Sequence, residues 1–299
     1  WLISPALPKL NEQHIDTIVY IPDGALRLLP LASLHDGQQY LIEHFAVVTL
    51  PSLSILPGNI ESKPSSQALL VGLSEPAVDT IAKLPDSLLS RLLNEANKTV
   101  PDSSSERSIE SLGSLRSVSS QLRKLNKPLE RSVKLANIAQ SLSLPGVKKE
   151  IEMLAQAMPS DIILNQDYSL KNFDRLAEKP QYNLIHIASH GFFGGSSDES
   201  FIMTYDDLLT IDHLEGLLTK RANQDPIDLL VLSACQTAEG DDRAPLGLSG
   251  IALKAKANSA LGSLWPISDE AAVELMQDFY AGLKQQGLSK AKALQQAQI

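Results

Sequence analysis

Apolar runs and amphipathic stretches alternate through most of the chain. Short aliphatic runs, typical of strands buried on both faces of a sheet, recur after residue 66. Between them, apolar residues stand three or four positions apart, which is helical spacing. The expected strands are 67–72, 161–164, 182–190, 229–233 and 260–265, and the expected helices are 148–158, 170–177, 207–220, 246–257 and 269–284. Strands that alternate with helices predict an α/β fold with a mostly parallel sheet and helices on both faces.

A different pattern occupies residues 1–60. Thr17–Ile21 predicts a strand that is closed by the turn Pro22-Asp-Gly24, because proline fixes φ and glycine accepts a positive φ. A second strand is predicted over Phe45–Leu50, where Pro51 ends it. We therefore expect a β-rich lead-in over residues 1–60 before a core over residues 61–299.

The core is interrupted at about residues 75–144. This segment contains a serine-rich and locally basic stretch, against the acidic balance of the whole chain. Leu88–Ala96 and Val118–Leu125 have some helical periodicity, and the remainder offers little apolar surface to bury. We interpret the segment as a loosely attached surface insertion. The alternative is a regulatory flap or docking surface near the functional site.

Composition limits the classes of function. The 299 residues are 43% hydrophobic and 20% charged, as in ordinary soluble domains, and the net charge of −9 argues against nucleic acid as a partner. A single cysteine favours a reducing compartment such as the cytoplasm. No apolar run approaches the ~20 residues of a membrane span. The first residue is Trp1 and the end has a helical pattern, so we expect a segment of a longer polypeptide.

Two of the predicted strands end in residues suited to nucleophilic catalysis. Cys235, the only cysteine, follows the run 229–233, and His190 ends the run that begins at Tyr182. The carboxyl ends of neighbouring parallel strands meet at one edge of a sheet, where ligand crevices form. An imidazole there could take the proton of the thiol and later protonate a leaving amine. A lone cysteine with a histidine about 50 residues upstream is a caspase-type pattern.

Backbone groups beside these two residues could complete the site. Gly191 has no side chain, so its N–H group can approach a tetrahedral oxyanion, with the N–H of Cys235 as the second donor. The alternative for Cys235 is a small buried hydrophobic residue, which is the usual fate of a single cysteine. The matching positions of Cys235 and His190 at strand ends favour the nucleophile.

His186, four residues before His190, raises the question of a metal. A His-x-x-x-His pair binds zinc on a helix, but here the segment predicts a strand and Ile187 stands where a metalloprotease has glutamate. We interpret His186 as a packed or hydrogen-bonded structural residue. Neither a metal nor an organic cofactor is expected.

Several motifs together resemble the CHAT family of caspase-like peptidases, which are related to separase and often follow TPR repeats. The resemblance covers residues ~16–72 and ~144–299. Its motifs are Ile21-Pro-Asp-Gly24, Leu29-Pro30, Tyr40-Leu-Ile-Glu43, His186-Ile-Ala-Ser-His-Gly191, Leu232-Ser-Ala-Cys-Gln-Thr-Ala238, Leu261-Gly-Ser-Leu-Trp265 with Asp269, and Asp278-Phe-Tyr280.

The resemblance implies a caspase-like three-layer sandwich and a His–Cys dyad at His190 and Cys235, with the amides of Gly191 and Cys235 as the oxyanion hole. The family continues with a final strand beyond this C-terminus. Where separase-like relatives have an aspartate that binds a basic residue before the scissile bond, this chain has Val273, and Asp269 is the nearest acid.

The resulting hypothesis is a cysteine endopeptidase that cleaves a specific protein partner, with an upstream TPR region or a regulatory protein as a further partner. No nucleic acid and no membrane is expected to bind. The alternative is a non-proteolytic signalling or scaffold module with the same fold.

Overall fold

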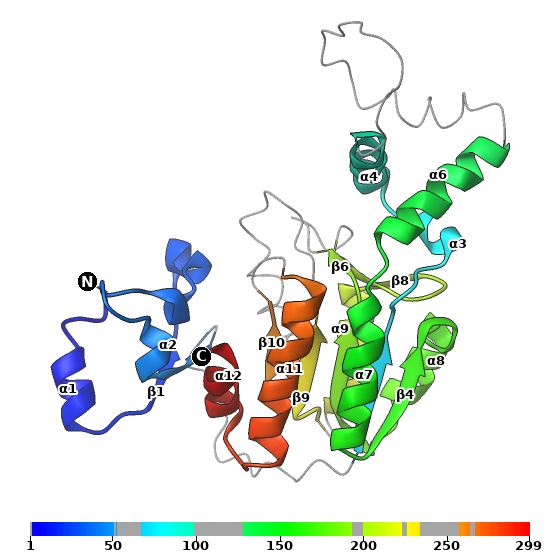
Figure 1. Ribbon diagram of the computed structural model, residues 1–299. Coiled ribbons are helices and arrows are strands. Elements are labelled where there is room, and N and C mark those ends of the chain that lie inside the picture. The colour runs from blue at the N-terminus through cyan, green and yellow to red at the C-terminus, as the bar shows by residue number, and fades with distance from the viewer. Residues whose placement is uncertain are drawn as a thin grey trace, which may run out of the picture.

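A five-stranded sheet forms the centre of the protein. The computed structural model describes residues 2–50, 52, 67–98, 128–192, 200–222, 226–233, 257–263 and 267–299. The sheet has the order β10-β9-β5-β3-β4, and every neighbouring pair is parallel (Figure 1). Its strands are β3 (Gln67–Gly72), β4 (Ser160–Leu164), β5 (Tyr182–Ala188), β9 (Leu229–Ser233) and β10 (Ala260–Gly262).

Helices cover both faces of this sheet, which gives the predicted caspase-like three-layer sandwich. One face carries α7 (Pro145–Ala157), α11 (Asp269–Lys284) and α12 (Lys290–Gln298). The other face carries α8 (Leu170–Ala177) and α9 (Ile211–Ala222). Alternate side chains of each strand enter the two layers: Leu184 and Ala188 of β5 pack with α7 and α11, whereas Ile185 and Ile187 pack with α8 and α9.

A small antiparallel sheet follows β5. It consists of β6 (Gly191–Phe192), β7 (Phe201–Met203) and β8 (Leu208–Thr210), in that order. The helix expected over 207–220 therefore begins only at Ile211. A short apolar run fits helix and strand equally well by periodicity, and pairing with β7 decides the outcome for Leu208–Thr210.

The lead-in packs beside α12 at one side of the core (Figure 1). A side-chain bond joins them, because the Nε2 of Gln295 donates to the carbonyl of Ile42 at 2.7 Å. The lead-in contains more helical turns than its apolar pattern predicted. Its elements are α1 (Leu7–Glu12), β1 (Thr17–Tyr20), η1 (Gly24–Leu28), η2 (Leu31–Ser33), α2 (Leu41–His44) and β2 (Ala46–Thr49), with β1 and β2 paired in parallel.

Both ends of the segment 75–144 belong to the core, which corrects the expectation of loose attachment there. Its described elements are α3 (Val78–Ile81), α4 (Asp86–Lys98) and α6 (Pro128–Ser141). Ile81, Leu89 and Ile138 are buried in the cluster on the α8 and α9 side of the sheet. Helical spacing gathers the few apolar residues of each helix on one face, and α4 forms where periodicity predicted it. The stretch 118–125 lies outside the described residues.

Other predicted elements are described only in part. The helix expected over 246–257 lies outside the described residues except for Ala257, and the strand expected over 260–265 is described as β10 over Ala260–Gly262. No helix in the described part of the chain is long and apolar enough to cross a membrane.

Candidate functional site

The ends of β5 and β9 meet in register at the carboxyl edge of the sheet. Ala188 of β5 is paired with Ser233 of β9, and the N–H of Ser189 donates to the carbonyl of Ser233 at 3.4 Å. His190 follows Ala188 by two residues, and in the sequence Cys235 follows Ser233 by two residues. Cys235 itself lies outside the described residues.

His190 is buried, and its ring has one fixed hydrogen bond. Its Nε2 lies 2.7 Å from the carbonyl oxygen of Leu142, in the turn between α6 and α7. A carbonyl can only accept, so Nε2 carries the proton and Nδ1 of the neutral ring is a bare acceptor. Nδ1 is buried and has no hydrogen-bond partner among the described residues. Within the described part of the chain, the basic nitrogen of His190 is therefore available to accept a proton.

The surroundings of His190 keep its ring neutral. Burial lowers the pKa of His190, while the carbonyl of Leu142 and the charge of Asp269 act in the opposite direction. The net lowering means that the ring is mostly neutral at pH 7 and can accept a proton. Its plane stacks on Phe192, with 6.4 Å between ring centroids. The combination of one donor bond and one stacking contact fixes the ring orientation.

Gly191 begins β6 directly after His190. The N–H of Met203 donates to the carbonyl of His190 at 2.9 Å, and Gly191 is paired with Ile202. Hydrogen-bonded and non-bonded pairs alternate along an antiparallel ladder, so the N–H of Gly191 points away from β7. This donor is directed to the side of β6 that no described strand occupies.

Asp269, the predicted substrate-binding acid, lies at the start of α11 and faces α7. One carboxylate oxygen accepts the N–H of Gly146, and the other, Oδ1, is buried without a hydrogen-bond partner in the described part of the chain. A Cβ at position 146 would come within 2.6 Å of the Asp269 Cγ, so the contact requires glycine. Val273 is 3% exposed and belongs to the core, which fits packing rather than substrate contact.

A fully buried polar cluster lies beneath this edge of the sheet. Nε2 of His186 is 2.8 Å from Oε1 of Glu150 in α7, and Nδ1 of His186 is 3.1 Å from the hydroxyl of Tyr280 in α11. Ser233 donates its hydroxyl to Oε2 of Glu150 at 3.1 Å. The expectation of a buried, hydrogen-bonded His186 is confirmed. These four residues are called the buried polar cluster below.

Glu150 and His186 approach each other closely without forming a well-directed hydrogen bond. Oε1 and Nε2 are within ion-pair distance, yet neither atom has an aligned hydrogen-bond partner among the described residues. Within the described residues no group of three or more His, Cys, Asp or Glu side chains is arranged to hold a metal ion.

Sequence reasoning missed two of these groups. Glu150 stands at an apolar position of α7, among Val147, Ile151 and Leu154, and a charge on the apolar face of a predicted helix was a visible signal. Leu142 acts through its backbone carbonyl, and no residue pattern marks such a role.

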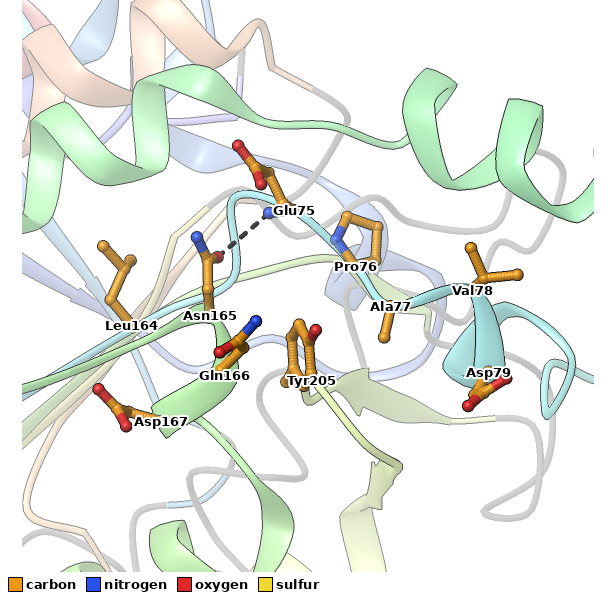
Figure 2. Close-up of a pocket in the computed structure, with 10 residues that line it drawn as sticks. All are labelled: Glu75, Pro76, Ala77, Val78, Asp79, Leu164, Asn165, Gln166, Asp167 and Tyr205. Carbon is orange, nitrogen blue, oxygen red and sulfur yellow. Dashed lines mark hydrogen bonds between the residues drawn. The ribbon is translucent and has the colours of Figure 1, made fainter.

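A separate pocket of about 680 Å³ lies at the carboxyl ends of β3 and β4 (Figure 2). The side chain of Asn165, in the turn η4 (Asn165–Asp167), accepts the backbone N–H of Glu75 at 3.2 Å and fixes one wall. The lining is acidic and apolar, and it does not include His190. The pocket therefore lies at the same carboxyl edge of the sheet as His190 but does not contain it.

The fold and this edge of the sheet define a caspase-like α/β protein. A family model described as the CHAT domain matches residues 1–299. The chain therefore belongs to the CHAT-domain family, and the resemblance drawn from its motifs is confirmed. No curated protein matches the chain.

Proposed function

We propose that the protein is a cysteine endopeptidase with Cys235 as nucleophile and His190 as general base and acid. The observation that carries the proposal is the state of His190, which is buried, neutral and has its Nδ1 atom unbonded among the described residues. A base needs a free basic nitrogen in a fixed orientation. The register of Ala188 with Ser233, two residues before His190 and Cys235 respectively, supports the pairing.

The proposed reaction follows from these groups. Nδ1 of His190 takes the thiol proton, and the sulfur of Cys235 adds to the scissile carbonyl carbon. The N–H groups of Gly191 and Cys235 stabilise the oxyanion. His190 then gives its proton to the leaving amine as the C–N bond breaks, which leaves a thioester. Water, deprotonated by His190, hydrolyses this thioester and regenerates the thiol. Only the side chains of the dyad move protons.

Asp269 is proposed to contribute to substrate binding. Its Oδ1 atom, buried and unbonded among the described residues, would accept a cationic side chain before the scissile bond. The substrate would be a specific protein partner, with an upstream TPR region or a regulatory protein as a second partner. A cytoplasmic location is proposed from the single cysteine, since it can form no internal disulfide.

The proposal is tested by alkylation and by peptide cleavage. We expect iodoacetamide to modify Cys235 in the wild-type protein at mildly acidic pH, and His190→Gln to slow that reaction, because a thiol without its base stays protonated. Mass spectrometry follows the modification without ambiguity, because the chain has one cysteine. Cleavage of a protein or peptide mixture should fall at least ~100-fold in Cys235→Ala. A smaller loss would remove Cys235 from the reaction.

The second candidate is a non-proteolytic scaffold, and the extent of the helices at the carboxyl edge favours it. The helices α4 and α6 extend beyond the sheet edge and offer a surface for partners (Figure 1). A scaffold has no need of an activated thiol. Equal alkylation rates for wild type and His190→Gln would support the scaffold over the peptidase.

A further inference from the structure

Ser233, the last residue of β9, is bonded to two other elements of the fold. Its hydroxyl donates to Oε2 of Glu150 in α7, and its carbonyl accepts the N–H of Ser189 directly after β5. Ser189 precedes His190 by one residue, and Ser233 precedes Cys235 by two. A single residue therefore joins the ends of the two strands that lead to the proposed base and nucleophile.

Glu150 is an unusual partner for a serine. It is 0% exposed and lies on the apolar face of α7. Burying a carboxylate is costly, and a buried ion pair rarely adds stability over apolar residues of similar volume. The contact with His186 offsets part of this cost, although the His186 N–H is not aligned with Oε1. Glu150 therefore contributes through the position in which it holds Ser233 rather than through added stability.

We propose that Glu150 and Ser233 are positioning residues for the nucleophile. Their hydrogen bond fixes the Ser233 side chain and attaches the end of β9 to α7. Because Cys235 follows Ser233 by only two residues in the sequence, we expect this bond to restrict the positions that the thiol can take relative to His190. The inference rests on the proposed function.

Within the buried polar cluster, the bond from Ser233 to Glu150 is expected to affect the nucleophile more than the other contacts do. Tyr280 bonds to His186 in the middle of β5, four residues before His190. Its hydroxyl stabilises the packing of α11. The hydroxyl of Ser233, in contrast, acts on the final residue of β9.

The two hydroxyls form a matched pair of substitutions. Each is fully or almost fully buried and each makes one side-chain hydrogen bond of 3.1 Å within the cluster. The test measures the rate of Cys235 alkylation by iodoacetamide at neutral pH in the full chain, together with the melting temperature. Ser233→Ala should slow alkylation about tenfold or more, because misplacement by about 1 Å of a reacting group can cost up to ~100-fold.

Tyr280→Phe should also lower the melting temperature, because His186 loses its hydroxyl partner, while alkylation stays within about twofold of wild type. Ser233→Thr retains the hydroxyl and should restore most of the rate. Loss of stability alone would slow both variants or neither, so rescue by threonine separates positioning from general weakening.

Each remaining outcome overturns the inference. These outcomes are equal slowing in Ser233→Ala and Tyr280→Phe, an unchanged rate in Ser233→Ala, or no recovery in Ser233→Thr. His190→Gln measured in parallel separates the two proposals. If it slows alkylation and Ser233→Ala does not, the dyad stands and the positioning role is wrong. If His190→Gln reacts as fast as wild type, Cys235 is not activated and both proposals are wrong.

Discussion

The Nε2 atom of His190 lies 2.7 Å from the carbonyl oxygen of Leu142, 48 residues earlier in the chain. Leu142 lies two residues before the end of the segment 75–144, in the turn where α6 passes into α7. The bond selects the ring tautomer, because a carbonyl accepts only an N–H. A backbone atom of a segment that resembled a surface insertion thus determines which nitrogen of the proposed base carries the proton.

The first prediction concerns this tautomer. In ¹⁵N NMR spectra at neutral pH, His190 should give the pattern of a neutral ring protonated at Nε2, with Nδ1 unprotonated. The reason is the bond to Leu142 together with the burial that lowers the pKa of His190. On acidification the ring should protonate below the ~6.5 of an exposed histidine. A neutral ring protonated at Nδ1 would contradict the assignment of the basic nitrogen.

A second prediction concerns the contact between α7 and α11. Gly146→Ala should lower the free energy of unfolding by roughly 1–3 kcal/mol, because its Cβ would lie 2.6 Å from the Asp269 Cγ and force the carboxylate away. Gly216→Ala is the matched control, since a Cβ there meets nothing within 4 Å on the exposed side of α9. It should be neutral or stabilise by up to ~1 kcal/mol. Urea unfolding measures both, and equal effects would show that no special contact exists at Gly146.

Much of the central sheet could be predicted from sequence because its strands are buried on both faces. Such strands are continuous apolar runs with sharp ends, and β3 and β9 occur where those runs predicted them. The helices α8 and α11 likewise follow a clear amphipathic period. Local apolar patterns were enough to predict these elements, because burial requires an apolar residue at every position that faces the core.

The contacts of the candidate site were harder to predict because they join distant segments through few atoms. The bond from His190 to Leu142 uses a backbone carbonyl, which any residue supplies. The bond from Ser233 to Glu150 depends on how α7 packs over β9, and its one sequence signal was a charge on an apolar helix face. His190, Gly191 and Asp269 were singled out from sequence, but their partners required the fold.

The third prediction concerns the charge of Asp269. Asp269→Asn keeps an acceptor for the N–H of Gly146 but removes the negative charge that raises the pKa of His190. The pKa of His190 should therefore fall further, and the ring should stay neutral to a lower pH. An NMR titration of His190 in both proteins measures the change directly. If catalysis follows the proposed dyad, the acid limb of the rate profile should move to lower pH. A pKa that rises or does not move would exclude an electrostatic link between the two residues.

The fourth prediction concerns alkaline stability. Burial, together with the nearby Glu150, raises the pKa of Tyr280 well above 10, and burial and a bond to Asp161 raise the pKa of Tyr182 to about 12. A phenol whose pKa is raised on folding keeps its proton in the native state while the unfolded chain loses it, so stability falls as pH rises above ~10. From pH 9 to pH 11 the fully buried Tyr280 should remove about 1.4 kcal/mol of unfolding free energy. Tyr182 should remove less, because its hydroxyl is only partly buried and is screened by solvent.

Substitution of Tyr280 by phenylalanine isolates its share of this loss. Tyr280→Phe should be less stable than wild type at pH 7, because it leaves His186 Nδ1 without its hydroxyl partner. Its further loss between pH 9 and pH 11 should nevertheless be smaller than that of wild type by about 1.4 kcal/mol. Urea unfolding at the two pH values gives the difference, and the double variant with Tyr182→Phe should reduce the loss again by a smaller amount. An identical pH dependence in wild type and Tyr280→Phe would mean that the native state ionises Tyr280 as readily as the unfolded chain does, and the buried polar cluster would then be open to solvent.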